Sequence, residues 1–170
     1  TRDATTLYTA VHEAFIRLLA PYLQRSSKSA HLRLNDADSP LSADQEPFLC
    51  FQRRARGDLL LERSNNASRT AGGVLAYKIL GSAQRRHRGA ILQHGSLVLG
   101  QSPAAPELPG WRELVGGSEP LAELVAGLPQ QLGTLLTNRW VRASLPDAIR
   151  DTARQIERDK YSDSSWTQRR

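Results

Sequence analysis

The residues best suited to chemistry lie in the middle of the chain, where an apolar segment contains a lysine. Lys78 is followed closely by the small residues Gly81, Ser82 and Ala83. A lysine directed into a pocket can stabilise a carbonyl oxygen or a phosphate as its negative charge grows. Small residues at a strand end allow a ligand or another backbone to approach closely. A simple β-bulge would explain the same tripeptide without any ligand.

Lysine is an unusual choice in this chain. Only three of the 23 basic residues are lysines, at positions 28, 78 and 160, and the others are arginines. A lysine inside the apolar segment is therefore harder to explain as a casual surface charge. A solvent-facing position on an edge strand remains an equal alternative.

Cys50 is the single cysteine, and its neighbours in the sequence have opposing effects. The thiolate is the reactive form, and three arginines within the next six residues would favour it if they fold toward the sulfur. Apolar neighbours on both sides favour burial, so the residues alone favour an unreactive thiol. The arginines are Arg53, Arg54 and Arg56, and the apolar neighbours are Phe48, Leu49 and Phe51. One cysteine excludes an internal disulfide and a cysteine-rich zinc site, so we expect no metal.

A basic run and two histidines complete the set of candidates. Arg85, Arg86 and Arg88 fall at the expected tip of a hairpin, with no aromatic residues between them. A solvated turn that could meet an acidic protein is therefore favoured over nucleic-acid binding. His94 could be a general base, or a strand histidine satisfied by backbone. His12 is expected at the surface or locally satisfied rather than as a ligand.

Length and composition place the chain among globular proteins of one domain. It has 170 residues, of which 39% are hydrophobic and 24% charged. No apolar run approaches the roughly 20 residues that cross a bilayer, and no leader precedes it, so we expect a cytoplasmic protein without membrane contact. The net charge of +6 favours partners that carry phosphate or an acidic surface. The start at Thr1 and the lack of methionine suggest a trimmed N-terminus.

Hydrophobic periodicity predicts an α+β fold with a mixed or antiparallel sheet flanked by helices. The expected helices are 3–24, 120–138 (interrupted at Pro129) and 146–160, and the expected strands are 31–34, 58–62, 74–82 and 89–99. Residues 84–88 would connect the last two strands as an antiparallel hairpin. Residues 35–47 and 100–120 are expected as loops, because turn-forming residues are frequent there.

Taken together, three short motifs resemble the signature of a known family. They are Lys78-Ile79, Gly81-Ser82-Ala83-Gln84 and Gln93-His94-Gly95-Ser96, with the basic turn between them. In this order they resemble the lipoate–protein ligase and octanoyltransferase family of the biotin/lipoate protein ligase superfamily. Leu49-Cys50-Phe51 resembles the Cys-Phe of the octanoyltransferase branch typical of Gram-positive bacteria, and residues 156–170 resemble the ending of that branch.

The resemblance implies a role for each candidate residue. Cys50 would take octanoyl from acyl carrier protein as a thioester, and a lysine of a lipoyl-domain protein would then attack it. Lys78 would contact the acyl carbonyl. The remaining implied roles are substrate binding by Gly81, Ser82, Ala83, Gln84, His94 and Gly95, and binding of acidic partner proteins by Arg85, Arg86 and Arg88. No cofactor is implied for this transferase reaction.

Two other interpretations stay open. The ligase branch of the family uses ATP with magnesium, forms a lipoyl-adenylate and needs no cysteine, and Lys78 would then hold the adenylate. Cys50 favours the transferase over the ligase. The third possibility is a subunit without catalysis that binds an acyl domain or nucleic acid.

The resemblance also implies an incomplete catalytic domain. Family members carry an Arg-Arg-x-x-Gly-Gly motif, leading to a histidine, well before the matching region. Residues 69–73 (Arg-Thr-Ala-Gly-Gly) are similar only superficially, because they lie just before Lys78. We therefore expect residues 1–170 to be the larger C-terminal part of one domain, which needs a separate or missing N-terminal segment.

Overall fold

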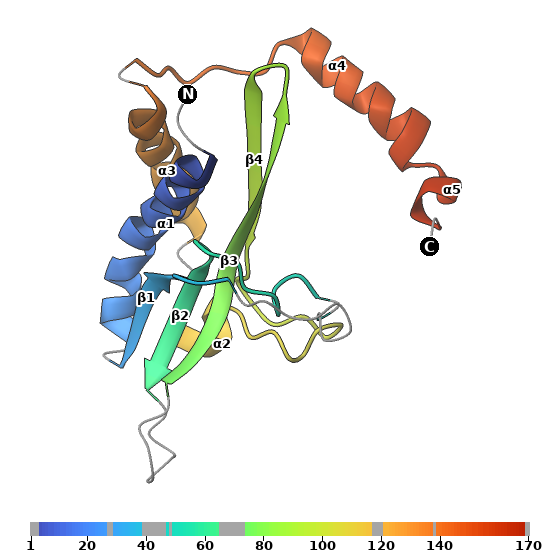
Figure 1. Cartoon of the computed structure of the whole chain (residues 1–170). Coiled ribbons are helices and arrows are strands. Elements are labelled where there is room, and N and C mark those ends of the chain that lie inside the picture. The colour runs from blue at the N-terminus through green and yellow to red at the C-terminus, as the bar shows by residue number, and fades with distance from the viewer. Residues whose placement is uncertain are drawn as a thin grey trace. The chain divides into compact units, whose positions relative to one another are not determined.

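The computed structural model describes residues 4–26, 29–38, 47, 49–64, 74–116, 121–137 and 139–168. The chain divides into two compact units, residues 1–138 and residues 139–170. Figure 1 shows the sheet and three helices in the first unit and the remaining helices in the second.

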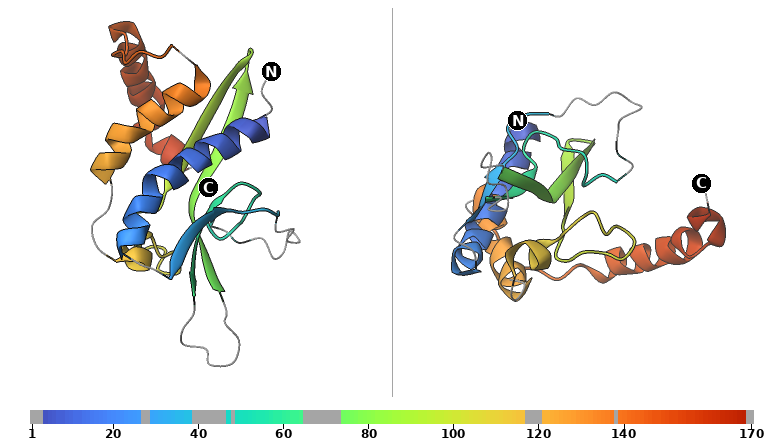
Figure 2. Two further views of the ribbon diagram at one scale, coloured as in Figure 1. Left: turned by 90° about the vertical axis from the view of Figure 1, so that its left-hand side faces the viewer. Right: turned by 90° about the horizontal axis from the view of Figure 1, so that it is seen from below.

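The first unit contains one four-stranded sheet. Its strands β1 (Ala30–Leu34), β2 (Leu59–Ser64), β3 (Val74–His87) and β4 (Ala90–Leu97) lie in the order β1-β2-β3-β4. Every neighbouring pair is antiparallel. The curled sheet and the helices beside it confirm the predicted α+β class and the four predicted strands (Figure 2).

The β3–β4 hairpin is longer and tighter than the sequence predicts. Arg88 and Gly89 form its turn, with φ values of 48° and 80°. Positive φ at both central residues is typical of the two-residue turns that match the twist of a hairpin. Residues 85–87 pair with residues 90–92, so the prediction of a connection over 84–88 is wrong. Figure 1 shows the hairpin extending beyond the other two strands.

A β-bulge lies next to Lys78. Leu59 pairs with Leu80 and Leu60 pairs with Lys78, which leaves Ile79 as an extra residue in β3. A bulge bends the strand locally, and here Ile79 and Leu80 are both buried, with 0% and 2% of their surface exposed. Residues 81–83 pair regularly with residues 94–96, so a bulge does not explain the small tripeptide.

The core lies between the sheet and the helices α1 (Ala4–Ser26), α2 (Trp111–Val115) and α3 (Leu121–Leu136). Its buried members are Leu19, Leu23, Leu59, Leu61, Ile79, Leu80, Trp111, Leu114, Val115 and Leu124. Helix α1 packs against both α3 and β1. These contacts bury one face of α1, as its predicted amphipathic pattern requires.

Two of the predictions about helices are wrong. The predicted loop over 100–120 contains α2, whose Trp111 is only 1% exposed. Glu113 accepts a hydrogen bond from the Gly110 amide (2.9 Å) and so satisfies the start of this short helix, which its Pro- and Gly-rich flanks hide in the sequence. Helix α3 continues through Pro129, because Pro129 lies on the exposed side, where the missing amide leaves no buried acceptor unpaired.

The second unit consists of short helices with exposed side chains. Helix α4 (Asp147–Ile156) leads into a π-helical turn, η1 (Glu157–Tyr161), and α5 (Ser164–Thr167) follows. The predicted helix over 146–160 is confirmed at its start, but its last turn is π-helical. Lys160 lies 4.4 Å from the centroid of the Trp166 ring. Within the described part of the whole chain, no helix combines the length and apolar character needed to span a bilayer.

Candidate functional site

Most of the predicted site residues line a single cavity of about 200 Å³ at the base of the β3–β4 hairpin. There Ser82 pairs with Gly95, and Ala83 pairs with His94. The cavity is lined by Cys50, Phe51, Lys78, Gly81, Ser82, Ala83, His94, Gly95 and Ser96. The structure therefore brings together seven of the eleven predicted site residues.

Lys78 is held inside the protein by three acceptors. Its ammonium lies 2.8 Å from Asp58 Oδ2, and its side chain is 10% exposed. It also donates to the carbonyl oxygens of Arg53 at 3.0 Å and Cys50 at 3.3 Å. The Phe51 ring centroid lies 5.5 Å from Nζ, close enough for a cation–π contact. The solvent-facing alternative is wrong, and Lys78 fixes the segment that carries Cys50.

Gly81 and Gly95 must lack a side chain, because atoms of neighbouring residues occupy the space that a Cβ atom would fill. A Cβ atom on Gly81 would lie 2.6 Å from Lys78 Cε and 3.0 Å from its Nζ. A Cβ atom on Gly95 would lie 2.4 Å from Ser82 Oγ and 2.6 Å from the Gly81 carbonyl oxygen. Glycine at 81 thus lets Lys78 reach Asp58, and glycine at 95 leaves room for the Ser82 hydroxyl.

Asp58 is the acceptor at the centre of the polar network, and no sequence motif predicts a functional role for it. It is 1% exposed. Besides Lys78, its carboxylate accepts hydrogen bonds from the Tyr8 hydroxyl and the Ala55 amide, both at 2.7 Å. The Asp58 carbonyl accepts from the Asn35 amide at 2.7 Å, which fixes the turn before β2. The sequence feature that could have indicated this role is the Gly57-Asp58 pair directly before an apolar strand.

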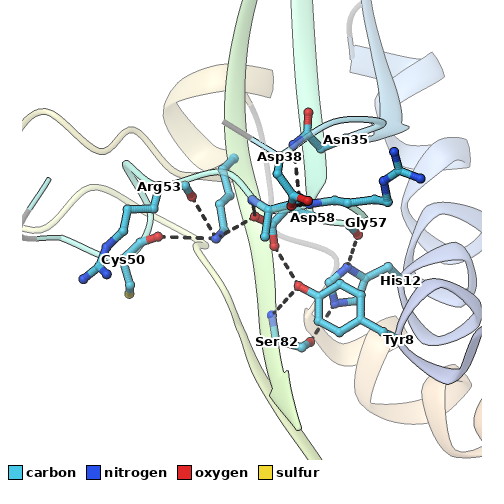
Figure 3. A network of polar contacts seen from close by, with 12 residues as sticks. Tyr8, His12, Asn35, Asp38, Cys50, Arg53, Gly57, Asp58 and Ser82 are labelled. Atoms are coloured by element: carbon cyan, nitrogen blue, oxygen red, sulfur yellow. Dashed lines mark hydrogen bonds and ion pairs between the residues drawn. The ribbon is translucent and has the colours of Figure 1, made fainter. Parts of the chain in front are cut away.

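His12 is the second residue of the network for which the sequence predicts no functional role. It is fully buried, and its ring bridges two distant segments (Figure 3). Nδ1 lies 2.6 Å from the Gly57 carbonyl oxygen, and Nε2 lies 2.6 Å from Ser82 Oγ. A carbonyl can only accept, so Nδ1 carries the hydrogen and Nε2 accepts from the Ser82 hydroxyl. The expectation of a surface position is wrong, while that of a satisfied histidine is confirmed.

Burial sets the protonation of the two polar residues that α1 contributes. It lowers the pKa of His12 from 6.5, and the uncharged ring is favoured. Burial, and then the hydrogen bond to Asp58, raise the pKa of Tyr8 far above its usual value, so the phenol stays protonated. The Tyr8 oxygen accepts from the Ser82 amide at 3.2 Å. The burial of Tyr8 and His12 could have been predicted from their spacing, which places them on the same helix face as Phe15 and Leu19.

Cys50 carries a free thiol and is exposed. The sequence-based expectation that Cys50 is buried is therefore wrong. Lys78 donates a hydrogen bond to the Cys50 carbonyl, and this contact holds Cys50 at the wall of the cavity rather than in the core. A thiol on an exposed residue at a cavity wall is accessible to an activated acyl group, toward which a thiolate acts as a nucleophile.

The other predicted residues lie farther along the hairpin. Gln84 is not among the described residues that line the cavity, and its amide donates to Gln93 Oε1 at 2.8 Å across the strand pair. Arg85, Arg86 and Arg88 are exposed. Arg86 and Arg88 line a second, larger cavity of about 540 Å³ at the hairpin tip.

Some sequence-based predictions fall on residues outside the described ranges. They concern Phe48, most of the predicted loop over 35–47, the superficial Arg-Thr-Ala-Gly-Gly motif at 69–73, and the final two arginines. Among the described residues, no group of three or more histidine, cysteine or acidic side chains could hold a metal ion.

Comparison with protein-family models, with curated proteins and with solved structures found no match for this chain.

Proposed function

We propose that the protein transfers an octanoyl group from acyl carrier protein to a lysine of lipoyl-domain proteins, through a thioester on Cys50. The observation that supports this proposal is the cavity itself, which is lined by the exposed residue Cys50, by Lys78 with its ion-paired ammonium, and by small residues. The finer assignment of the fold as biotin/lipoate protein ligase-like, without its N-terminal part, belongs to the same proposal.

The reaction takes place in two steps. The Cys50 thiol gives up its proton, and the thiolate attacks the acyl carbonyl of the carrier thioester. A new C–S bond forms, the C–S bond to the carrier breaks, and the carrier thiolate leaves and takes up a proton. The amine of the acceptor lysine then attacks the Cys50 thioester, an amide bond forms, and the Cys50 thiol is released. A covalent intermediate divides one difficult transfer into two easier ones.

Lys78 has a defined place in both steps. Each attack turns the acyl oxygen into an oxyanion, which a positioned donor stabilises. The Lys78 ammonium has three hydrogens and three acceptors, of which the Cys50 carbonyl at 3.3 Å is the most distant. An oxyanion beside Cys50 would take over this hydrogen while the two shorter contacts keep the amine in place.

The cavity of about 200 Å³ suits an unbranched acyl tail. Burial of a hydrocarbon chain stabilises a complex by ~0.8 kcal/mol per CH₂, which amounts to roughly 5 kcal/mol for an octanoyl tail. Such a contribution distinguishes short from medium chains, while a single added CH₂ changes binding only modestly.

The test is to incubate the protein with octanoyl-carrier protein and to measure its intact mass. Because Cys50 is the only cysteine, a thioester adduct must vanish in Cys50→Ala. Lys78→Met should slow its formation, whereas Lys160→Met, which changes a lysine of the second unit, serves as the matched control. The assay uses the chain alone and the chain extended by whatever coding sequence precedes Thr1.

Other outcomes would replace the proposal. Formation of lipoyl-adenylate that requires ATP and magnesium and survives Cys50→Ala would assign the ligase reaction. Absence of both activities, combined with retention of RNA that weakens with salt, would assign a binding role.

A further inference from the structure

We propose that His12 accepts the proton of the incoming lysine amine through the Ser82 hydroxyl, and so acts as the buried base of the second transfer step. This inference rests on the proposed function. It assigns a role to a buried pair that neither transfer step, as written above, requires.

The second step needs a base. A lysine side chain arrives as an ammonium, since its pKa is about 10.4 in water, and only the uncharged amine can attack a thioester. Lys78 is itself a cation with three acceptors. Asp58 is buried behind Lys78 and already accepts three hydrogen bonds or ion-pair contacts. Among the described residues, this leaves His94 and the Ser82–His12 pair.

The Ser82–His12 pair has the geometry of a hydroxyl and its base. Ser82 lines the cavity, and its Oγ lies 2.6 Å from His12 Nε2. The Gly57 carbonyl holds Nδ1–H at 2.6 Å and so keeps the lone pair of Nε2 directed at Ser82. A base oriented by a third group is the arrangement that activates serine in nucleophilic enzymes. Here the hydroxyl joins a solvent-accessible cavity to a fully buried ring.

The charges around the ring allow it to gain and release a proton. The titratable described groups that face it are Tyr8 on the same helix, Asp58 before β2 and Lys78 on β3. Burial favours the uncharged ring, which is the form that accepts a proton. Asp58 stabilises the imidazolium once it has formed, and Lys78 opposes it, which promotes release of the proton afterwards.

The lysine ammonium gives one proton to Ser82 Oγ while Ser82 gives its own proton to His12 Nε2. The free amine attacks the Cys50 thioester, the C–N bond forms and the C–S bond breaks. The second proton of the nitrogen passes to the leaving sulfur, which restores the Cys50 thiol. His12 returns its proton through Ser82 to solvent.

The experiment separates proton removal from every other role of the pair. Cys50 is first loaded with octanoyl, the donor is removed, and discharge of the adduct is followed by intact mass. One acceptor is a lipoyl domain with its lysine, and the other is hydroxylamine, which is already uncharged at neutral pH. The variants are Ser82→Ala, Ser82→Thr and His12→Gln. Ser96→Ala, which changes another residue of the same cavity, is the control, and His94→Gln tests the rival base.

We expect Ser82→Ala and His12→Gln to slow discharge to the lipoyl domain by at least about tenfold, as loss of a general base does. Discharge to hydroxylamine should stay near the wild-type rate, and Ser82→Thr, which keeps a hydroxyl, should recover most of the lysine rate. The wild-type rate should fall in acid as His12 becomes protonated, and His12→Gln should lose that dependence.

Three results would overturn the inference. Equal slowing with both acceptors would assign the pair a structural role. Unchanged discharge to lysine in Ser82→Ala would remove Ser82 from the path, and a loss confined to His94→Gln would make His94 the base. Failure of wild-type Cys50 to carry octanoyl at all is a different result, because it overturns the proposed function together with this step.

Discussion

The two ends of the β3–β4 hairpin differ in how their side chains are held. At the base, Ser82, Lys78 and their partners Asp58 and His12 form a network in which each polar group has a named partner. At the tip, Arg85, Arg86 and Arg88 are exposed beside a two-residue turn.

This difference separates two uses of charge. A charge that must act on a reacting atom needs neighbours that fix its position, and the base provides them for the Lys78 ammonium. A charge that only attracts an acidic partner needs exposure, because steering acts over about one Debye length, ~10 Å at moderate salt. The comparison predicts large effects on stability at the base and effects on encounter rate alone at the tip.

Removal of the Asp58 carboxylate should have the largest effect. Asp58→Asn leaves the Lys78 ammonium buried without its counter-charge, and breaking a buried pair costs about 3–5 kcal/mol. The free energy of unfolding, measured by urea titration, should fall by that amount. Asp147→Asn, which breaks the exposed pair with Arg150, should change it by less than about 0.5 kcal/mol. If Asp58→Asn lowered the free energy of unfolding as little as Asp147→Asn does, the ion pair at the base would stabilise the fold no more than an exposed ion pair.

Gly95→Ala should have the next largest effect. The new Cβ would lie 2.4 Å from Ser82 Oγ and 2.6 Å from a backbone oxygen, and such overpacking costs about 1–3 kcal/mol. The matched change at the tip is Gly89→Asn. Gly89 has no atoms within 4 Å of its added Cβ, and asparagine tolerates its φ of 80°. Thermal unfolding should give a lower melting temperature for Gly95→Ala than for Gly89→Asn. Similar melting temperatures for the two variants would contradict this prediction.

The pH dependence of stability should report on His12. Burial lowers the pKa of His12 in the folded protein below 6.5, so the unfolded chain binds its proton more readily. Stability therefore falls as the pH falls below about 6.5, toward the pKa of the folded state. Urea midpoints measured at neutral and mildly acidic pH should show this loss, and His12→Gln should reduce it. His87→Gln at the exposed tip should leave it unchanged.

The sequence predicts that two neighbouring strands pair and bring the residues of the base together, but it misplaces the turn and therefore does not predict their register. Once Arg88 and Gly89 form the turn, antiparallel register alone places Ser82 opposite Gly95 and Ala83 opposite His94. No information about distant contacts is needed. The four strands were predictable for the same reason, since each carries its own apolar pattern.

The sequence does not predict the network behind the base, because its contacts join residues far apart in the chain. His12 meets Gly57 and Ser82 at separations of 45 and 70 residues, and Tyr8 meets Asp58 at a separation of 50. Each contact depends on which face of α1 turns toward β3. Helical periodicity identifies the buried face of α1 from its apolar residues. A polar residue on that face, such as His12, does not fit the apolar pattern, so the pattern does not predict that it is buried.

The tip offers the smallest expected effect and the clearest test of the comparison. Replacing Arg85, Arg86 and Arg88 together with glutamine should leave the free energy of unfolding within about 0.5 kcal/mol, because these side chains are exposed. Transfer from acidic octanoyl-carrier protein should slow severalfold at low salt and approach the wild-type rate at high salt, since steering is screened. Transfer from a small uncharged octanoyl thioester should be unaffected at any salt. A loss that persists with the small donor would place these arginines in the chemistry, and the two ends of the hairpin would then share one function.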